Sequence, residues 1–114
     1  MPQFALALNL RDDPQVIAEY EAHHRKVWPE VLAAIRATGV EDIKIYRHGR
    51  HLFMTITGPE GFDPVGAFAE YEHDPVVQRW EALMRTFQEP LPGAPPGRWW
   101  TRMACIFDLA GEKA

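Results

Sequence analysis

The chain opens with a run in which every second side chain is large and apolar. These positions are Phe4, Leu6, Leu8 and Leu10, and the residues between them are alanine or asparagine. A period of two is typical of a strand with one buried face. The sequence therefore predicts a first strand here. Because the run lacks a basic start, it indicates a strand rather than a signal peptide.

Acid–proline pairs in the next segment predict the starts of helices. Asp12-Asp13-Pro14 places an acidic N-cap candidate before a proline that suits the first helical position, so a helix is expected from about Pro14 to Lys26. Pro29 disfavours helix at Trp28, so we expect the chain to bend there and to begin a second helix. Thr38-Gly39 is expected to end that helix, because glycine accepts the left-handed cap conformation.

Two apolar segments around a short turn with glycine predict a hairpin in the middle of the chain. The turn is Arg47-His48-Gly49-Arg50, and the strands lie on either side of it. The other expected elements are a helix over Phe62 to Glu72, a helix that starts at Asp74-Pro75, a stiff proline-rich loop over 90–97 and a last strand over Trp99 to Leu109.

The order of these elements is β-α-β-β-α-β, with each helical part split in two. This order predicts the ferredoxin-like α+β fold, an antiparallel sheet with helices on one face. The other face of the sheet must then be covered. Either a second copy of the chain packs there, or a pocket forms there. A homodimer of the dimeric α/β-barrel type is the expected solution.

Size, charge and cysteine content restrict the possible partners. The 114 residues, 46% of them hydrophobic, suffice for one packed core, so a single domain over 1–114 is expected. A net charge of −4 without a basic run disfavours nucleic acid and anionic membranes as partners. No apolar stretch approaches the roughly 20 residues of a membrane span. The sequence is therefore interpreted as a soluble, cytoplasmic protein.

No motif in the chain calls for a metal ion or another cofactor. Cys105 is the single cysteine, which excludes an internal disulfide, and it is expected to be a small core residue of the last strand. His48 and His51 flank the hairpin turn and are expected to be solvated, without the spacing of a metal site. No glycine-rich phosphate loop is present.

The segment around the end of the first helix carries the most distinctive chemistry. Tyr20, His24 and Trp28 follow each other at intervals of four and would form one stripe in a continuous helix. The stripe combines a phenol, a group that titrates near neutral pH and a flat apolar ring, which together can hold a small polyol and move protons on it. His23 lies on the stripe of Val16, Tyr20 and Val27, so periodicity alone does not say which imidazole faces the interior.

Tryptophans outside this segment are candidates for a sugar platform. Trp80 lies on the apolar face of its helix, where it is expected in the core, and its indole could border a pocket. Trp99 and Trp100 open the expected last strand, where adjacent side chains point to opposite faces. At most one of these two is therefore expected to line a given pocket.

These features together resemble the L-rhamnose mutarotase family, small dimeric ferredoxin-like enzymes that interconvert the α and β anomers of a 6-deoxy sugar. The resemblance covers nearly the whole chain, and its two most specific parts are the His-x3-Trp-Pro-Glu and Gln-Arg-Trp motifs. The matching residues are Glu19-Tyr20, His24, Trp28-Pro29-Glu30, Gly39, Ile45-Tyr46, Leu52-Phe53-Met54, Gln78-Arg79-Trp80 and Met84.

The resemblance implies roles for three of these side chains. By the family pattern His24 is the proton donor, whereas Tyr20 and Trp80 contact the sugar. The chain departs from the pattern at Ile43 and Glu81, where the rhamnose enzyme carries tyrosine and tryptophan in its sugar-binding set. The substrate is therefore open between L-rhamnose and L-fucose, on which close relatives of the family act.

The expected function is ring opening and closure of an aldopyranose by proton transfer, without metal or cofactor. We expect His24 to be the acid–base group and Tyr20 to position hydroxyls, with Trp80 and Trp28 stacking on the sugar. Two alternatives share the fold. A cofactor-independent dimeric α+β barrel monooxygenase would have an apolar pocket without the tyrosine–histidine pair, and a non-enzymatic dimeric binding module would have no pocket.

Overall fold

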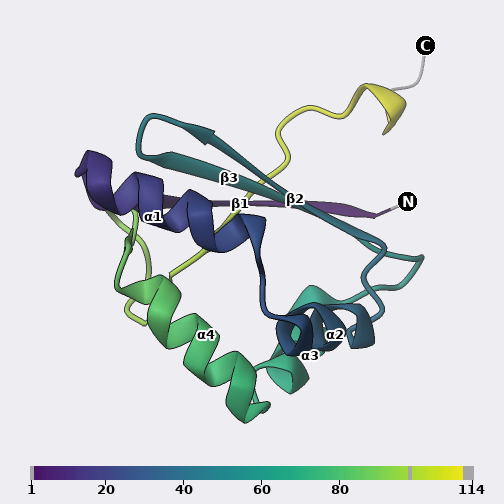
Figure 1. Cartoon of the computed structure of the whole chain (residues 1–114). Coiled ribbons are helices and arrows are strands. Elements are labelled where there is room, and N and C mark those ends of the chain that lie inside the picture. Colours follow the sequence, from purple (N-terminus) through teal and green to yellow (C-terminus); the bar gives the residue numbers. More distant parts are fainter. Residues whose placement is uncertain (1, 98, 112–114) are drawn as a thin grey trace.

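The computed structural model of the chain describes residues 2–97 and 99–111 and shows a sheet with helices on one side (Figure 1). Its element order agrees with the predicted β-α-β-β-α-β plan, with each helical part split in two. The elements are β1 (Gln3–Leu10), α1 (Pro14–Arg25), α2 (Pro29–Ala37), β2 (Asp42–His48), β3 (His51–Thr57), α3 (Pro64–Tyr71), α4 (Pro75–Arg85), β4 (Gln88–Glu89), β5 (Thr101–Met103) and a 3₁₀ turn, η1 (Leu109–Gly111).

The sheet is antiparallel throughout, and β1 lies in its centre. The strand order is β2-β3-β1-β4, and β5 also pairs with β1. β4 pairs with β1 at Asn9 and Leu10, whereas β5 pairs with β1 from Ala5 to Ala7. These two short strands therefore share the position of the fourth strand of a ferredoxin-like sheet, and the predicted fold class is confirmed.

The predicted last strand, Trp99 to Leu109, is wrong in both its length and its start. The strand spans three residues, Thr101–Met103, and β4 occupies the other half of this edge. Met103 already pairs with Ala5, so little of β1 is left for the residues that follow. Cys105 is consequently exposed, with its thiol donating to the carbonyl oxygen of Phe107 at 3.3 Å, and the prediction that it is a core residue is wrong.

Helix starts follow the acid–proline signals of the sequence. The carboxylate of Asp13 accepts from the backbone N–H of Gln15 at 2.9 Å, and Asp74 caps α4 in the same way at 2.8 Å. Trp28 has extended backbone angles, φ −56° and ψ 133°, and directly precedes α2. The bend expected before Pro29 therefore separates α1 from α2.

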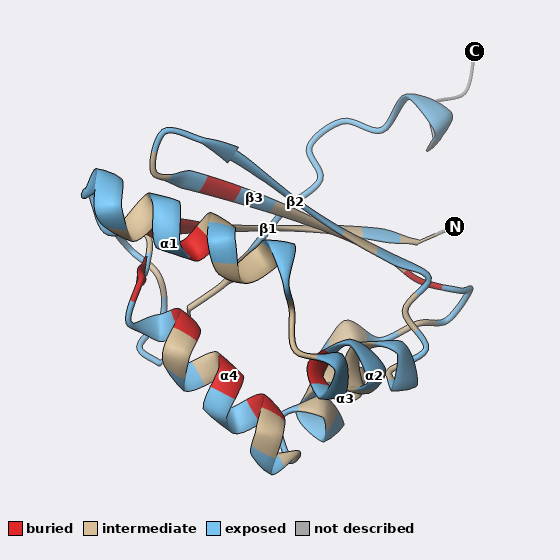
Figure 2. Cartoon of the chain, viewed as in Figure 1, coloured by how far each residue is buried: buried red, intermediate tan, exposed pale blue. Residues whose placement is uncertain are grey.

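The core lies between the sheet and the helices, as the red segments in Figure 2 show. Leu8, Leu10, Val31 and Val77 are fully buried. Because side chains alternate along β1, its even-numbered residues face the helices and its small odd-numbered residues lie on the opposite face.

No helix in the described part of the chain is long and apolar enough to cross a membrane.

Candidate active site

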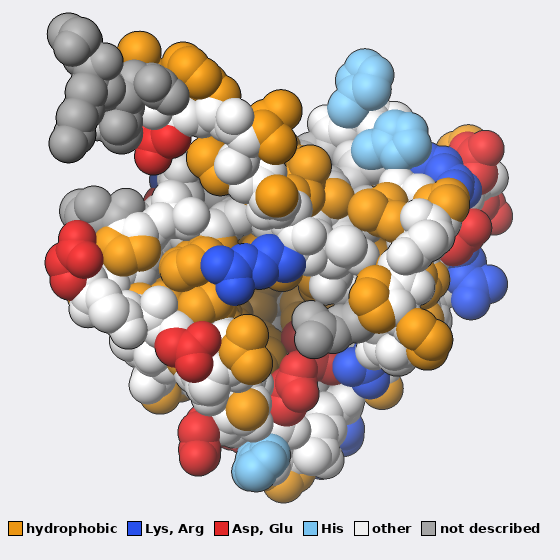
Figure 3. Space-filling model, turned by 180° about the vertical axis from the view of Figure 1, so that it is seen from behind, with side chains coloured by type: hydrophobic (Ala, Val, Ile, Leu, Met, Phe, Trp, Pro, Cys, Tyr) orange, Lys and Arg blue, Asp and Glu red, His pale blue; other side chains and the backbone are white. Residues whose placement is uncertain are grey.

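A cavity of about 950 Å³ lies between the sheet and the four helices. Figure 3 shows the molecule from behind, where hydrophobic side chains surround a hollow and charged side chains lie at its rim. The volume lies near the upper end of the range for small-molecule sites, about 300–1,000 Å³. The polar and aromatic groups of its lining include Tyr20, His24, Tyr71, Trp80, Glu81, Arg85, Gln88, Trp99, Trp100 and Arg102.

His24 lines this cavity from the last turn of α1. Its Nδ1 lies 2.9 Å from the carbonyl oxygen of Tyr20. Because a carbonyl oxygen only accepts, Nδ1 carries the hydrogen, and Nε2 is the nitrogen available to a ligand. Burial lowers the pKa of His24 below its ordinary value, and the nearby His23 lowers it further. The imidazole is therefore neutral at pH 7, with an Nε2 lone pair that can take a proton.

His23 packs against aromatic side chains of α4 and of the residues that follow it. Its ring packs against Phe87, with centroids 5.5 Å apart, and edge-on against Trp80 at 6.3 Å. It is not among the described residues that line the cavity. Of the two imidazoles that periodicity could not separate, His24 is the one that faces the cavity, because successive helical residues point about 100° apart.

Tyr20 is buried beside His24 and holds its hydroxyl in the cavity wall. The tyrosine is 4% exposed, and its hydroxyl oxygen accepts from the Gln88 amide at 3.2 Å. Burial raises the pKa of Tyr20 to about 12. The phenol therefore keeps its proton at neutral pH and can donate it to an oxygen of a bound molecule. Gln88 is a polar group that sequence reasoning missed, because it follows α4 in a two-residue strand that no pattern predicted.

Trp80 forms an aromatic wall next to His24. The two ring centroids lie 5.7 Å apart at a steep angle, and Trp80 is buried. Trp28 packs edge-on against Trp80 at 5.2 Å and is not among the described lining residues. The structure thus brings Tyr20, His24 and Trp80 together around the cavity and places Trp28 behind Trp80.

Trp99 and Trp100 both line the cavity, contrary to the prediction that at most one would do so. That prediction assumed strand geometry, but β5 begins only at Thr101, and the two tryptophans lie in a bend before it. The guanidinium of Arg85 lies 5.8 Å from the Trp99 ring centre. The cavity wall is therefore more aromatic than the sequence pattern indicated.

Glu81 is the acidic group of α4 that lines the same cavity. The hydroxyl of Tyr71 donates to its Oε1 at 3.1 Å. Burial raises the pKa of Glu81 above its ordinary value, whereas Tyr71 and Arg85 lower it. Sequence analysis noted Glu81 only as a departure from a family pattern. Glu81 directly follows Trp80, which lies on the apolar face of α4. This position is the sequence feature that could have indicated that Glu81 points inward.

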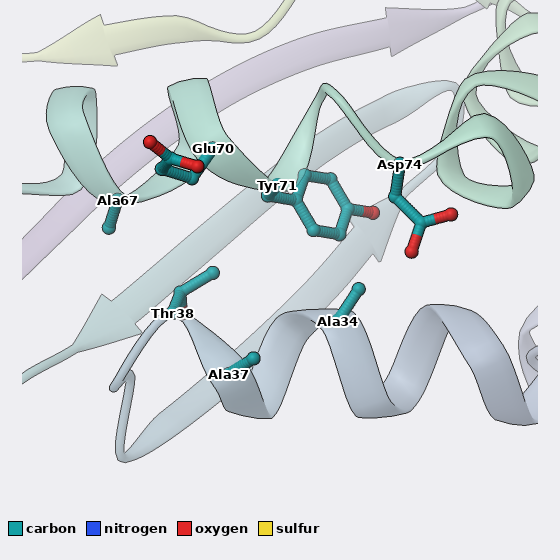
Figure 4. A pocket seen from close by; sticks show the side chains of 7 residues that line it. All are labelled: Ala34, Ala37, Thr38, Ala67, Glu70, Tyr71 and Asp74. Atoms are coloured by element: carbon teal, nitrogen blue, oxygen red, sulfur yellow. The ribbon is translucent and has the colours of Figure 1, made fainter.

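A second, smaller hollow of about 190 Å³ lies between α2 and α3 (Figure 4). Tyr71 borders both hollows, and its ring lies between the two helices. Other polar groups here already serve local structure, since the Thr38 hydroxyl donates to the carbonyl of Ile35 and Asp74 caps α4. The larger cavity is therefore the candidate site. Within residues 2–97 and 99–111, no group of three or more His, Cys, Asp or Glu could hold a metal ion.

Comparisons of sequence connect the chain to sugar-isomerising enzymes. The profile of a family described as L-rhamnose mutarotase matches residues 3–109. An L-fucose mutarotase of Xanthomonas campestris is 42% identical over 112 residues, which are 96% of this chain and 90% of that protein. An L-rhamnose mutarotase of Acidiphilium cryptum is 31% identical over 98 residues, 84% of this chain and 88% of that protein.

Comparisons of structure support the fold. The crystal structure of an L-rhamnose mutarotase from Formosa agariphila matches with a TM-score of 0.68 at 15% identity, over 96% of this chain and 99% of that one. Tetracenomycin F2 cyclase from Streptomyces glaucescens, a type-II polyketide cyclase, matches with a TM-score of 0.64 at 12% identity, over 95% and 96%. At such low identity these likenesses show the shared fold alone.

Proposed function

Because this chain belongs to the L-rhamnose mutarotase family, we propose that its cavity binds a 6-deoxyhexose and interconverts the α and β anomers of that sugar. The chain is an anomer-interconverting isomerase of carbohydrates. L-Fucose is the first candidate substrate, because a relative 42% identical over 96% of the chain is an L-fucose mutarotase, and L-rhamnose is the second. One observation carries the assignment of the site: Nε2 of His24 is available in the cavity beside Tyr20 and Trp80.

The proposed reaction begins with a proton transfer to His24. Nε2 takes the proton of the anomeric hydroxyl, and the electron pair of the O1–H bond forms the C1=O1 double bond. The C1–O5 bond breaks with its electron pair on O5, and O5 receives a proton from an acid. The open aldehyde rotates about its C1–C2 bond, O5 attacks the other face of C1, and both protons return. Such general acid–base catalysis is worth about 10²- to 10⁴-fold.

The neighbouring side chains have supporting roles in this proposal. The Tyr20 hydroxyl, which Gln88 orients at 3.2 Å, donates to a sugar hydroxyl. Trp80 covers the apolar face of the pyranose ring, and Trp28 supports Trp80 from behind at 5.2 Å. No role for a cofactor is proposed.

We propose that two copies of the chain pack through the helix-free face of the sheet. Tyr46 and Phe53 lie side by side on this face, with ring centroids 6.3 Å apart, and are 55% and 36% exposed. The segment after β5 leaves the sheet on this side (Figure 1) and exposes Ile106 and Phe107 to 96% and 67%. An uncovered apolar face of this kind is typical of an interface. The cytoplasmic location expected from the sequence stays a prediction.

Neither alternative function gains support from the cavity. The oxygenase alternative expects a pocket without the tyrosine–histidine pair, but Tyr20 and His24 both line this one. The binding-module alternative expects no pocket. At 12% identity, the similarity to the polyketide cyclase shows the fold alone.

Saturation-transfer NMR on L-fucose and L-rhamnose tests the proposed function directly. The wild-type protein should accelerate anomer exchange of one of the two sugars, and His24→Ala should lower kcat/KM about 100-fold or more. His48→Ala is the matched control, because His48 is exposed on the hairpin and lies outside the cavity. Exchange by His24→Ala at the wild-type rate would refute the assignment of His24.

A further inference from the structure

The cavity holds a second side chain suited to proton transfer, and it lies on α4 rather than α1. Glu81 is only partly exposed, although it is a carboxyl group on a helix, and it lines the same cavity as His24. One hydrogen bond and one electrostatic interaction connect it to the site. Tyr71 donates to its Oε1 at 3.1 Å, and its charge is close enough to Tyr20 to act on that hydroxyl.

We propose that Glu81 is the partner of His24 in catalysis, the acid that protonates the ring oxygen of the sugar when the ring opens. This inference rests on the proposed function and deepens it. A mutarotase must transfer two protons, one from the anomeric oxygen O1 and one to the ring oxygen O5. Both oxygens are bonded to C1. His24 from α1 and Glu81 from α4 approach the cavity from different helices, so one group can serve each oxygen.

The proton balance closes with these two groups alone. Nε2 of His24 takes the hydroxyl proton of O1, and the C1=O1 double bond forms as the C1–O5 bond breaks with its electron pair on O5. The Glu81 carboxyl gives its proton to O5. After rotation about C1–C2, the Glu81 carboxylate takes the proton back as O5 attacks C1. His24 then returns its proton to the anomeric oxygen, so both side chains end the cycle as they began.

The environments of the two groups suit these roles. Burial lowers the pKa of His24 and raises the pKa of Glu81, which favours a neutral base and a protonated acid. Opposite shifts of this kind in one site are a mark of acid and base assignment. The charged and titratable groups that line the cavity together with Glu81 are Tyr20 and His24 of α1, Arg36 of α2, Tyr71 of α3, Glu72 at the C-cap of α3, Arg85 of α4, and Glu41, Asp42 and Arg102 from the sheet side.

Tyr71 is the positioning residue for Glu81. Its ring lies between α2 and α3 (Figure 4), and its hydroxyl donates to the carboxyl group. This hydrogen bond favours the ionised form and so lowers the pKa of Glu81. Loss of the Tyr71 hydroxyl should therefore move the titration of Glu81 to higher pH.

The test compares Glu81→Gln, Tyr71→Phe and Glu60→Gln by saturation-transfer NMR from pH 5 to pH 9. Glutamine keeps an acceptor for Tyr71 but has no proton to transfer. We expect kcat/KM of Glu81→Gln to fall about 100-fold, mainly in kcat. In wild type, kcat/KM should decline at alkaline pH as Glu81 loses its proton, and this decline should be absent from Glu81→Gln. Tyr71→Phe should keep this decline and move it to higher pH. Glu60→Gln removes an exposed carboxylate outside the cavity and should match wild type.

The outcomes separate this inference from the proposed function. If wild type exchanges anomers and Glu81→Gln keeps both its rate and its alkaline decline, the inference is overturned while the proposed function stands. If Glu81→Gln changes KM alone, Glu81 only binds the sugar, and the inference is again wrong. If wild type accelerates exchange in none of the sugars tested, both the proposed function and the inference fail. Thermal melting of each variant shows that the compared proteins are folded.

Discussion

His24 and Tyr20 are coupled across one turn of α1, with Nδ1 of His24 2.9 Å from the Tyr20 carbonyl oxygen and the two ring centroids 4.4 Å apart. The hydrogen bond selects the tautomer of the imidazole and holds the imidazole ring beside the phenol ring. A histidine oriented in this way presents Nε2 in a defined direction, which proton transfer to a bound molecule requires. The spacing of four residues, visible in the sequence, is therefore the basis of the site.

The first prediction concerns the pH dependence of activity. Burial lowers the pKa of His24 from 6.5, so His24 stays neutral until the pH falls below that value. We expect kcat/KM to decline on the acid side with a midpoint below pH 6.5. His23→Gln should keep this decline, because His23 packs against Phe87 outside the cavity. A wild-type midpoint at or above pH 6.5 in the NMR exchange assay would contradict the lowered pKa.

The second prediction concerns Tyr20 and stability in alkali. The folded protein keeps the phenol neutral to about pH 12, whereas the unfolded chain ionises near pH 10. The unfolded state therefore loses a proton first, and stability falls between these values, by about 1 kcal/mol at pH 11 from this group. Tyr20→Phe should remove this part of the decline. At pH 7 it should cost about 1–3 kcal/mol, because the buried Gln88 amide loses its partner.

Urea unfolding of both proteins at pH 8 and pH 11 measures this effect. The comparison is between the pH-dependent losses and not between the absolute stabilities, so the cost of the lost hydrogen bond cancels. An equal loss in wild type and in Tyr20→Phe would show that the phenol ionises normally in the folded state.

The third prediction separates the two packed tryptophans. Trp80 lines the cavity and Trp28 lies behind it, so Trp80→Phe should raise KM more than Trp28→Phe does. An aromatic contact is worth about 0.5–1.5 kcal/mol, which corresponds to an increase of roughly 2- to 12-fold. Steady-state analysis of anomer exchange gives KM for each variant. A larger increase in Trp28→Phe would place that ring, and not Trp80, against the sugar.

The fourth prediction concerns the cap of the helix that carries the site. Asp13 accepts from the N–H of Gln15, so Asp13→Ala should lower the free energy of unfolding by about 1 kcal/mol. Asp12→Ala is the control, because Asp12 is exposed and does not cap α1. Chemical denaturation of the two variants measures the difference. If both variants lose the same free energy of unfolding, the loss of a negative charge, and not the loss of the cap, explains the effect.

The fifth prediction tests the proposed dimer. Phe53→Lys combined with Tyr46→Lys places charge on the helix-free face of the sheet and should shift the protein to a monomer in sedimentation velocity. Ala33→Lys adds a lysine at an exposed position of α2 and should leave the dimer intact. A wild-type protein that sediments as a monomer at micromolar concentration would exclude this interface.

The sequence by itself determined the order of the elements and most of their bounds. Alternation along β1, the acid–proline starts at Asp13 and Asp74, and the bend before Pro29 are local signals that act on neighbouring backbone, so the fold class followed from them. The spacing of Tyr20 and His24 likewise determined that the two side chains meet, because residues four apart share a helix face.

Only the tertiary structure decided which groups share the cavity. His24 rather than His23 faces it, Glu81 and Gln88 join from α4 and β4, and both Trp99 and Trp100 line it. The last strand stops at Met103 for a similar reason, since its length depends on how much of β1 is free to pair. Burial and strand pairing depend on contacts between segments that are far apart in the chain. A periodicity that spans a few residues carries no information about these contacts.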